Sequence, residues 1–208
     1  MTFEAAGLAC VRGERLVFEH LDFTLGPGGA LLLEGPNGSG KSSLLRLCAG
    51  LLAPAEGRLA WDQAAIGEDP EAHRERLQFV GHLDGVKPVF TVVENLGFWA
   101  GLCGAAPATV LDALGRVGLG HLAGLPARFL SAGQRRRLNL ARLLLGTATP
   151  LWLLDEPTSA LDRAGAEMLA GVIEQHRTGG GMVIAATHLD LGLEAPPRLD
   201  LRDYAVAA

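Results

Sequence analysis

The chain has 208 residues, 49% of them hydrophobic and 20% charged, a balance typical of globular proteins that excludes the disordered and fibrous classes. This length accommodates one well-packed domain but not two independent ones, so a tandem arrangement of two such domains is excluded. With a formal net charge of -5, the chain offers no general electrostatic attraction for nucleic acid or an anionic membrane surface.

We expect neither a secretion signal nor a membrane span. Glu4 stands where a signal peptide has a basic start. The longest uncharged stretch, Leu96–Leu111, is interrupted by glycines and a proline and falls short of the roughly 18 apolar residues that a span requires. Cys10, Cys48 and Cys103 form no Cys-x-x-Cys pair, which favours reduced thiols in a cytosolic compartment. We expect all three to be small core residues.

The first part of the chain is rich in predicted strands. Apolar residues alternate loosely over Phe3–Leu25, which predicts antiparallel strands joined by turns. A short apolar strand, Ala30–Leu33, leads through a glycine-rich loop to leucines at helical spacing over Lys41–Leu52. A second β-pair is predicted at Gly57–Ile66 and a buried strand at Leu77–Gly81.

The second part of the chain is dominated by helices. Two short amphipathic segments, Val92–Leu102 and Ala108–Val117, predict a helical lobe. A helix, a strand, a helix and a strand are predicted after it, over Ala132–Leu145, Leu151–Leu154, Ala164–Arg177 and Met182–Ala186. This alternation implies a mostly parallel sheet covered on both faces. We therefore predict one α/β domain over residues 1–208, with a core from 1–84 and 146–208 and a helical lobe at about 85–145.

A phosphate-binding loop is the most specific motif. The pattern G-x4-G-K-[ST] is matched between a predicted strand and a predicted helix by Gly35, Pro36, Asn37, Gly38, Ser39, Gly40, Lys41 and Ser42. Glycines let the backbone direct its N–H groups at a phosphate, and the N-terminus of the helix adds partial positive charge. Lys41 is expected to reach the β- and γ-phosphates of ATP, and Ser42 to bind Mg²⁺. Ser43 is expected to bind nucleotide as well.

Two acids follow the apolar strand Leu151–Leu154. Asp155 is expected to hold Mg²⁺ through water, and Glu156 to orient or deprotonate the water that attacks the phosphate. Adjacent acids alone could equally start a helix, but the phosphate loop favours the catalytic interpretation. His188 also follows a strand, and we expect it to donate to the γ-phosphate, although a lone histidine there is more often structural.

The segment Leu130-Ser131-Ala132-Gly133-Gln134 resembles the LSGGQ signature of ATP-binding-cassette proteins. It lies between the phosphate loop and the acid pair, as in that family, and the resemblance covers essentially the whole chain. It implies a P-loop NTPase cassette fold with an N-terminal antiparallel β-layer. It also implies a dimer with a second copy, in which Ser131, Gly133 and Gln134 contact the γ-phosphate held opposite. Asp162 lies in a segment that resembles the family's D-loop and would couple the two sites. Without these companions, Ser131 would be an ordinary helix cap.

The chain departs from the family pattern at two places. Arg12 stands where the family usually has an aromatic residue against adenine, and its guanidinium plane could stack instead. Leu83 stands where the family has its Q-loop glutamine, and the adjacent His82 could partly substitute.

Within the family, the chain resembles the ATPase of the bacterial cytochrome c maturation system, described as a haem exporter subunit. The resemblance rests on the variant signature followed by Arg135-Arg136-Arg137 and on the segments 79–82, 85–87 and 94–96. It implies a peripheral protein on the cytoplasmic face of the bacterial inner membrane. There it would work with integral membrane subunits to release a haem-loaded chaperone. We interpret the arginine run as a solvated or interfacial face, and expect no nucleic acid partner.

Two alternatives stay open at this point. The chain could be the ATPase of another importer or exporter, which co-purified membrane subunits would distinguish. It could also be a soluble cassette protein of DNA repair or translation, but that class needs a coiled-coil insertion or tandem cassettes. Val89–Trp99 is expected to border the groove for the membrane partner, although Phe98 and Trp99 could equally belong to the lobe core.

Overall fold

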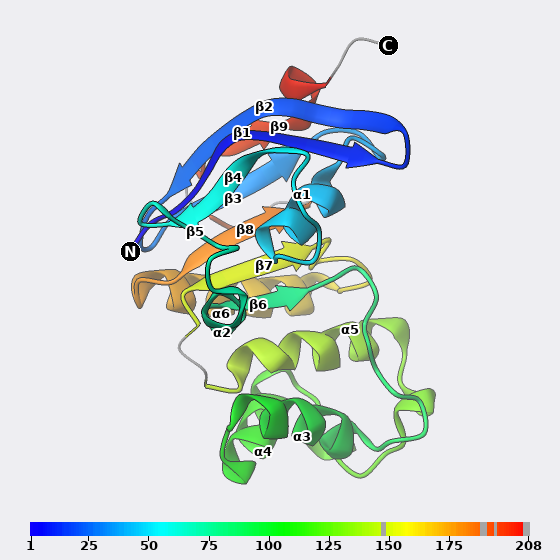
Figure 1. The fold of residues 1–208 in the computed structure, drawn as a ribbon. Helices are drawn as coiled ribbons and strands as arrows, with labels where there is room; N and C mark the ends of the chain where they lie inside the picture. The colour runs from blue at the N-terminus through cyan, green and yellow to red at the C-terminus, as the bar shows by residue number, and fades with distance from the viewer. Residues whose placement is uncertain (147–148, 188–190, 194, 206–208) are drawn as a thin grey trace. The chain divides into compact units, whose positions relative to one another are not determined.

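The computed structural model describes residues 1–146, 149–187, 191–193 and 195–205, and it consists of two compact units (Figure 1). Unit 1 comprises Met1–Gly81, Thr149–Glu156 and Ile173–Ala208, and unit 2 comprises His82–Ala148 and Pro157–Val172. The predicted lobe at about 85–145 falls within unit 2, which also takes in the segment after Glu156.

An antiparallel sheet forms the N-terminal part of unit 1. Its strands are β1 (Phe3–Arg12), β2 (Arg15–Leu25), β4 (Glu56–Trp61) and β5 (Ala64–Ala65), in the order β2-β1-β4-β5. β1 pairs antiparallel with both β2 and β4. The predicted N-terminal β-layer and the second β-pair are both confirmed.

A five-stranded sheet forms the rest of unit 1, and all its neighbouring strands are parallel. It contains β3 (Ala30–Glu34), β6 (Leu77–Val80), β7 (Leu151–Asp155), β8 (Met182–Ala186) and β9 (Arg198–Asp200), in the order β6-β7-β8-β3-β9. Parallel strands end at one edge of a sheet, so β3 and β7 deliver the phosphate loop and Asp155 to the same side. β9 was not predicted, because three residues on an edge show no usable alternation.

The helices of unit 1 differ from the prediction at two places. Helix α1 (Lys41–Cys48) stops before the predicted Leu52, because Gly50 takes a left-handed conformation with φ 67° and ends the helix. Helix α2 (Pro70–Glu75) was not predicted, although Asp69 caps it and proline occupies its first turn. A helix of this length leaves no periodic pattern in the sequence.

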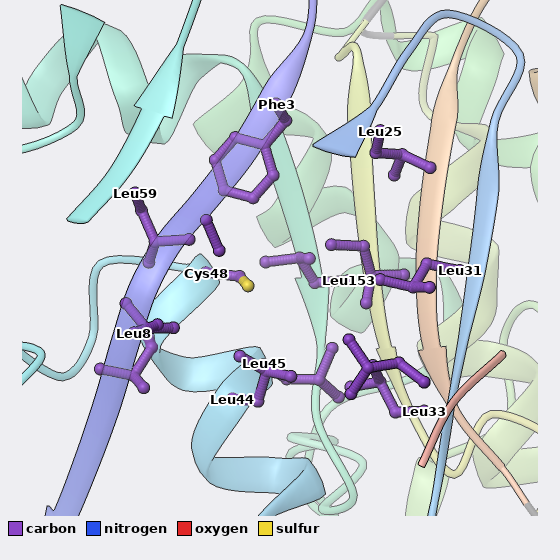
Figure 2. Close-up of a cluster of buried hydrophobic side chains, with 14 of the residues drawn as sticks. Phe3, Leu8, Leu25, Leu31, Leu33, Leu44, Leu45, Cys48, Leu59 and Leu153 are labelled. Atoms are coloured by element: carbon purple, nitrogen blue, oxygen red, sulfur yellow. The ribbon is translucent and has the colours of Figure 1, made fainter. Parts of the chain in front are cut away.

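The core of unit 1 contains side chains from both sheets and from α1 (Figure 2). Alternate residues of the parallel strands belong to it, such as Leu31 and Leu33 of β3. On the other face of β7, Trp152 stacks on His176 of α6 (Arg163–Thr178), with ring centroids 3.7 Å apart. Burying a large apolar side chain contributes about 1.5–3 kcal/mol, so both faces of the sheet stabilise the unit.

Two of the three cysteines lie in this core as expected. Cys10 and Cys48 are buried, and burial raises the pKa of both thiols. Cys103 is only half-buried, so the expectation that it is a core residue is wrong. It ends a helix of unit 2, where its thiol lies 3.0 Å from the carbonyl oxygen of Trp99.

Unit 2 consists of helices and connecting turns. It contains α3 (Val92–Cys103), α4 (Pro107–Arg116), α5 (Ala132–Leu140), the first part of α6, and the 3-10 turns η1 (Gly120–Leu122), η2 (Ala127–Phe129) and η3 (Ala141–Leu144). The two predicted helices of the lobe are confirmed to within one residue. The predicted helix Ala132–Leu145 is α-helical only to Leu140 and tightens into η3, as helix ends often do. In the part of the chain that the structure describes, no helix is long and apolar enough to span a membrane.

Candidate functional site

The phosphate loop joins the end of β3 to the start of α1, and its glycines are required by the geometry. Gly35, Gly38 and Gly40 have φ of 128°, 82° and 107°, which side chains rarely tolerate. A Cβ on Gly35 would lie 2.6 Å from Ser39 Oγ. A Cβ on Gly40 would lie 2.7 Å from Val17 Cγ1. The loop therefore needs glycine for its conformation and for its close packing.

Lys41 is held over this loop. Its ammonium donates to the carbonyl oxygens of Gly35 at 2.6 Å and Pro36 at 3.2 Å, and the residue is 8% exposed. Helix α1 begins at Lys41 with no side-chain cap and no acid in its first turn. Its N-terminus therefore keeps the partial positive charge that attracts anions.

A second observation fits a phosphate at this loop. The hydroxyl of Ser39 is buried and has no hydrogen-bond partner among the described residues. Buried polar groups in proteins are almost always paired. A phosphate oxygen would supply the acceptor that this hydroxyl lacks, so the residues present fit a bound nucleotide.

Ser42 and Asp155 meet where α1 and β7 come together. The Ser42 hydroxyl lies 3.1 Å from Asp155 Oδ1, and Asp155 is 4% exposed. Groups of three or more His, Cys, Asp and Glu with metal-binding geometry do not occur among the described residues. Mg²⁺ needs no such group, because it usually takes one or two protein oxygens together with phosphates and water. These two oxygens therefore fit the predicted Mg²⁺ site.

Glu156 follows Asp155 with an unusual backbone. Its φ is 47°, in the left-handed region, and its N–H donates to Ala186 O of β8 at 2.8 Å. A left-handed non-glycine residue costs roughly 1 kcal/mol or more, and such strain is concentrated at functional sites. The chain thus turns sharply as it leaves the sheet, which directs two adjacent acids differently. His188, predicted to be catalytic together with Lys41 and Glu156, lies outside the described residues.

The β1–β2 hairpin lies against this region of unit 1. A Cβ on Gly40 would also come within 3.0 Å of Phe18 in β2. Burial raises the pKa of the Cys10 thiol, and the nearby Arg12 charge and a hydrogen bond with Ser43 oppose this rise. Arg12 and Ser43 therefore both lie near Cys10, which brings the exposed Arg12 into the neighbourhood of α1.

Sequence reasoning missed an acid beside the phosphate loop. Asp200 ends β9, where it is the register partner of Glu34, the last residue of β3. A Cβ on Gly35 would lie 3.7 Å from Asp200 Oδ1. Arg202, and more weakly Lys41, lower the pKa of this carboxyl. No motif could have revealed Asp200, because only the pairing of β9 with β3 brings it to the loop.

The signature-like segment starts a helix in unit 2. Ser131 Oγ accepts from the N–H of Gln134 at 3.2 Å, and Gln134 Oε1 accepts from the N–H of Ser131 at 2.9 Å, which makes a capping box for α5. A Cβ on Gly133 would lie 2.8 Å from the carbonyl oxygen of Ala160. Glycine at this position therefore lets the segment around Ala160 approach α5 closely.

Asp162 is paired within its own unit. It accepts from the N–H of Gly165 at 2.9 Å and forms an ion pair with Arg137. The Gly165 N–H and then the Arg137 side chain hold the pKa of Asp162 below its usual value. The predicted coupling residue is thus oriented by α5 and by the start of α6.

The three-arginine run is engaged inside unit 2 rather than solvated. Arg136 is 1% exposed, donates to Pro157 O at 3.2 Å and pairs with Asp84 at 3.3 Å. Arg135 donates to the Leu130 carbonyl oxygen at 2.7 Å. The interpretation as a solvated face is therefore wrong for Arg136, whereas the interfacial alternative stays a prediction. The run joins α5 to the segments that follow Leu83 and Glu156 in the chain.

Unit 2 also exposes apolar side chains around residues 83–90. Leu83 is 85% exposed and Val89 72%. A cavity of about 470 Å³ opens here, and its lining includes Leu83, Val86, Pro88 and Arg128. We call Leu83, Val86, Pro88, Val89 and Phe90 the apolar rim.

The two aromatic residues on α3 behave differently. Phe98 is 58% exposed, so it is not a lobe core residue. Trp99 packs inside the lobe, because Arg142 lies over its ring at 3.4 Å from the centroid. Burial lowers the pKa of Arg142 to about 10.

Known proteins resemble this chain over nearly its whole length. Residues 18–159 match the ABC transporter family model. The chain is 56% identical to the cytochrome c biogenesis ATP-binding export protein CcmA of Paramagnetospirillum magneticum, over 99% of this chain and 96% of that protein. The same protein of Rhodospirillum rubrum is 56% identical, over 98% of this chain and 87% of that protein.

Solved structures show the same fold. A putative ABC transporter ATP-binding protein from Pyrococcus furiosus has a TM-score of 0.83 and 25% identity, over 99% of this chain and 100% of that one. A dimeric ATP-binding cassette in a post-hydrolysis state, bound to ADP and Pi, has a TM-score of 0.78 and 25% identity, over 91% and 89% of the two chains.

Proposed function

This chain belongs to the ABC transporter family, and on that premise we propose that it is the ATP-hydrolysing subunit of a cytochrome c biogenesis exporter. The observation that carries the proposal is the 56% identity to export proteins of this kind over nearly the full chain. The geometry of unit 1 supports the enzymatic part, because the phosphate loop, Ser42 and Asp155 converge at one edge of the parallel sheet.

Each predicted site residue of unit 1 is proposed to have a role that follows from its chemistry. The backbone of residues 35–43 and the Lys41 ammonium bind and orient the phosphates, while Arg12 stacks against the adenine. Ser42 and Asp155 would hold Mg²⁺, and the bound ion would neutralise charge on the transferred phosphoryl group. Glu156 orients the attacking water and accepts its proton, and His188 donates to the γ-phosphate.

A second copy of the chain completes the site. The dimeric cassette bound to ADP and Pi supports an arrangement in which Ser131, Gly133 and Gln134 of one copy reach the γ-phosphate on the other. The start of α5 suits this role, because a helix N-terminus attracts anions. Asp162 couples the two sites through the segment that its pairing with Arg137 and Gly165 orients.

The membrane subunits of the exporter dock on the apolar rim. Exposed apolar side chains gathered at one surface commonly mark an interaction site, and Leu83 and Val89 expose most of their area. The chain would then lie peripherally on the cytoplasmic face of the bacterial inner membrane. Its ATP hydrolysis would drive release of a haem-loaded chaperone on the other side.

The test is to isolate the subunit from membranes with its partners and to measure ATP hydrolysis by the complex. We expect cytochrome c maturation membrane proteins to co-purify, and Glu156→Gln to abolish turnover while ATP binding persists. Recovery of the membrane subunits of a different importer or exporter would keep the ATPase but contradict the assignment to cytochrome c biogenesis.

Charge placed on the apolar rim tests the docking surface. Leu83→Glu should reduce co-purification of the membrane subunits and leave ATP affinity unchanged. Leu111→Glu is a matched control, because Leu111 is 59% exposed on α4 and lies outside the rim. Equal loss of partners in both variants would contradict docking at the rim.

His82 is proposed to replace the missing Q-loop glutamine. It is exposed beside Leu83, at the start of unit 2. We expect His82→Ala to lower Mg²⁺-dependent turnover and its stimulation by the membrane subunits. Unchanged turnover and stimulation in this variant would remove the proposal.

A further inference from the structure

Asp200 has a structural role as the capping residue of a 3-10 turn, which explains why a side chain that accepts hydrogen bonds is found at this position. Its Oδ1 accepts from the N–H of Arg202 at 2.9 Å and so caps the turn η4 (Leu201–Tyr204). This turn places Leu201, which is fully buried, into the core of unit 1. A capping side chain is therefore needed at position 200 to hold η4 on the core.

The same carboxylate lies beside the phosphate loop. β9 pairs with β3, and its end brings Asp200 Oδ1 to 3.7 Å from the position of a Cβ on Gly35. The Lys41 charge also contributes to lowering the pKa of Asp200. Like charges repel with an energy that falls with distance and with solvent screening. A bare carboxylate at this place would thus oppose the binding of a triphosphate.

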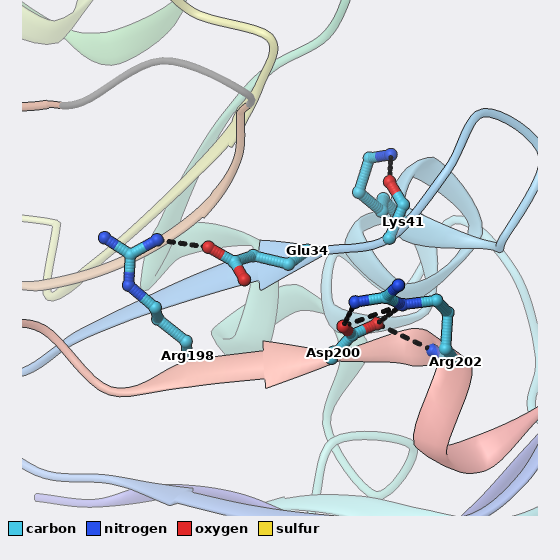
Figure 3. Close-up of polar contacts among 6 residues, drawn as sticks. Glu34, Lys41, Arg198, Asp200 and Arg202 are labelled. Carbon is cyan, nitrogen blue, oxygen red and sulfur yellow. Dashed lines mark hydrogen bonds and ion pairs between the residues drawn. The ribbon is translucent and has the colours of Figure 1, made fainter.

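Arg202 resolves this conflict. Its Nε lies 3.0 Å and 2.9 Å from the two oxygens of Asp200, and a terminal nitrogen pairs with Oδ2 (Figure 3). A fork of this kind fixes the orientation of a carboxylate as well as balancing its charge. The neighbouring acid Glu34 is balanced in the same way, by Arg198. Glu34 and Asp200 thus each pair with an arginine of their own.

We propose that Arg202 is a positioning residue for nucleotide binding, which clamps and neutralises Asp200 so that this acid can cap η4 without repelling the phosphates of ATP. The inference rests on the proposed function, because it needs ATP at this loop. It adds a residue outside the phosphate loop and the acid pair.

The test compares nucleotide affinities of the purified chain for ATP, ADP and AMP at low and high salt. Arg202→Ala should weaken ATP binding by about threefold to tenfold at low salt. The loss of affinity in this variant should be smaller for ADP and smallest for AMP, because these nucleotides carry fewer negative charges for Asp200 to repel. It should also be smaller at high salt, because salt screens this repulsion. A purely structural role would weaken all three nucleotides equally and would not respond to salt.

The double variant Asp200→Asn with Arg202→Ala separates charge from capping. Asparagine caps helices as well as aspartate does, so this variant should fold and regain wild-type affinity for ATP. Arg177→Ala is the matched control. Arg177 also pairs with an acid, Glu174, but it donates to Gly28 O, which precedes β3, whereas the phosphate loop follows β3. We expect no change of ATP affinity in the control.

Three outcomes would overturn the inference. They are unchanged ATP affinity in Arg202→Ala, no recovery in the double variant, and an equal loss in Arg177→Ala. If Arg202→Ala does not fold, the single variant Asp200→Asn tests the inference instead. It should bind ATP at least as tightly as the wild type at low salt, and weaker binding would contradict the inference. Failure of the wild-type chain to bind ATP at all would instead contradict the proposed function.

Discussion

Two residues of unusual backbone, Glu156 and Ala160, stand close together in the sequence and have φ of 47° and 61°. Neither is a glycine, so each conformation is held by its surroundings. At Glu156 the hydrogen bond to Ala186 O provides this support. At Ala160 the conformation depends on a close approach to α5. The carbonyl oxygen of Ala160 can lie against Gly133 only because Gly133 has no side chain.

Gly133→Ala tests this close approach at the scale of one residue. The new methyl group would lie 2.8 Å from Ala160 O, so the backbone of one segment must shift. We expect a loss of stability of about 1–3 kcal/mol and at least a tenfold loss of ATP hydrolysis by the complex. Urea unfolding and a steady-state ATPase assay would measure the two effects.

Gly171→Ala is the control for this substitution. A Cβ on Gly171 in α6 would meet no atom within 4 Å. Since alanine favours a helix over glycine by about 1 kcal/mol, this variant should be slightly more stable and fully active. Full activity of Gly133→Ala would show that the close approach has no functional role.

At the scale of elements, the start of α3 organises the loop that carries part of the apolar rim. Asn95 is 6% exposed, and its side-chain nitrogen, with two N–H groups to share, lies 3.0, 3.2 and 2.9 Å from the carbonyl oxygens of Lys87, Phe90 and Thr91. It also accepts from the N–H of Lys87 at 2.7 Å. One buried amide thus fixes the backbone on both sides of Val89.

Asn95→Ala should therefore lower the free energy of unfolding by about 2–3 kcal/mol, because the loop loses the hydrogen bonds of one buried side chain and the N–H of Lys87 loses its acceptor. Urea denaturation of the chain would measure it. Thr91→Ala, which removes only the exposed capping box of the same helix, should cost about 1 kcal/mol. A smaller effect for Asn95→Ala than for Thr91→Ala would contradict this account of the loop.

At the scale of the whole molecule, one buried histidine, His73, and one half-buried histidine, His176, predict a dependence of stability on pH. Burial lowers the pKa of His73 and of His176. Trp61 Nε1 donates to His73 Nδ1 at 3.0 Å, so the other ring nitrogen donates to Cys48 O. The folded state thus favours the neutral ring, whereas the unfolded chain takes up protons near pH 6.5.

Stability from these histidines is complete above about pH 6.5 and is lost as the pH falls through their lowered folded pKa values. We expect the free energy of unfolding to decrease between pH 7.5 and 5. His73→Gln, whose amide can keep both hydrogen bonds, should make this dependence less steep. Carboxylates with lowered pKa values, such as Asp162, lose their contribution only below about pH 4. An unchanged slope in His73→Gln would contradict the assignment.

The sequence predicted the parts of the fold and site that depend on local pattern. The buried strands, the phosphate loop and the acid pair all carry strong signals over a few adjacent residues. Asp200 and Arg136 were missed or misread, because their roles depend on residues far away in the chain. Helix α2 and strand β9 are too short for periodicity to act as evidence.

The position of β3 between β8 and β9 has a consequence for biosynthesis. The strand that carries the phosphate loop leaves the ribosome long before either of the strands that flank it in the sheet. A nascent chain that ends at Thr178 has β3 but neither partner, so the loop has no rigid base. We therefore expect the growing polypeptide to acquire nucleotide affinity only after residues 182–200 have emerged from the ribosome.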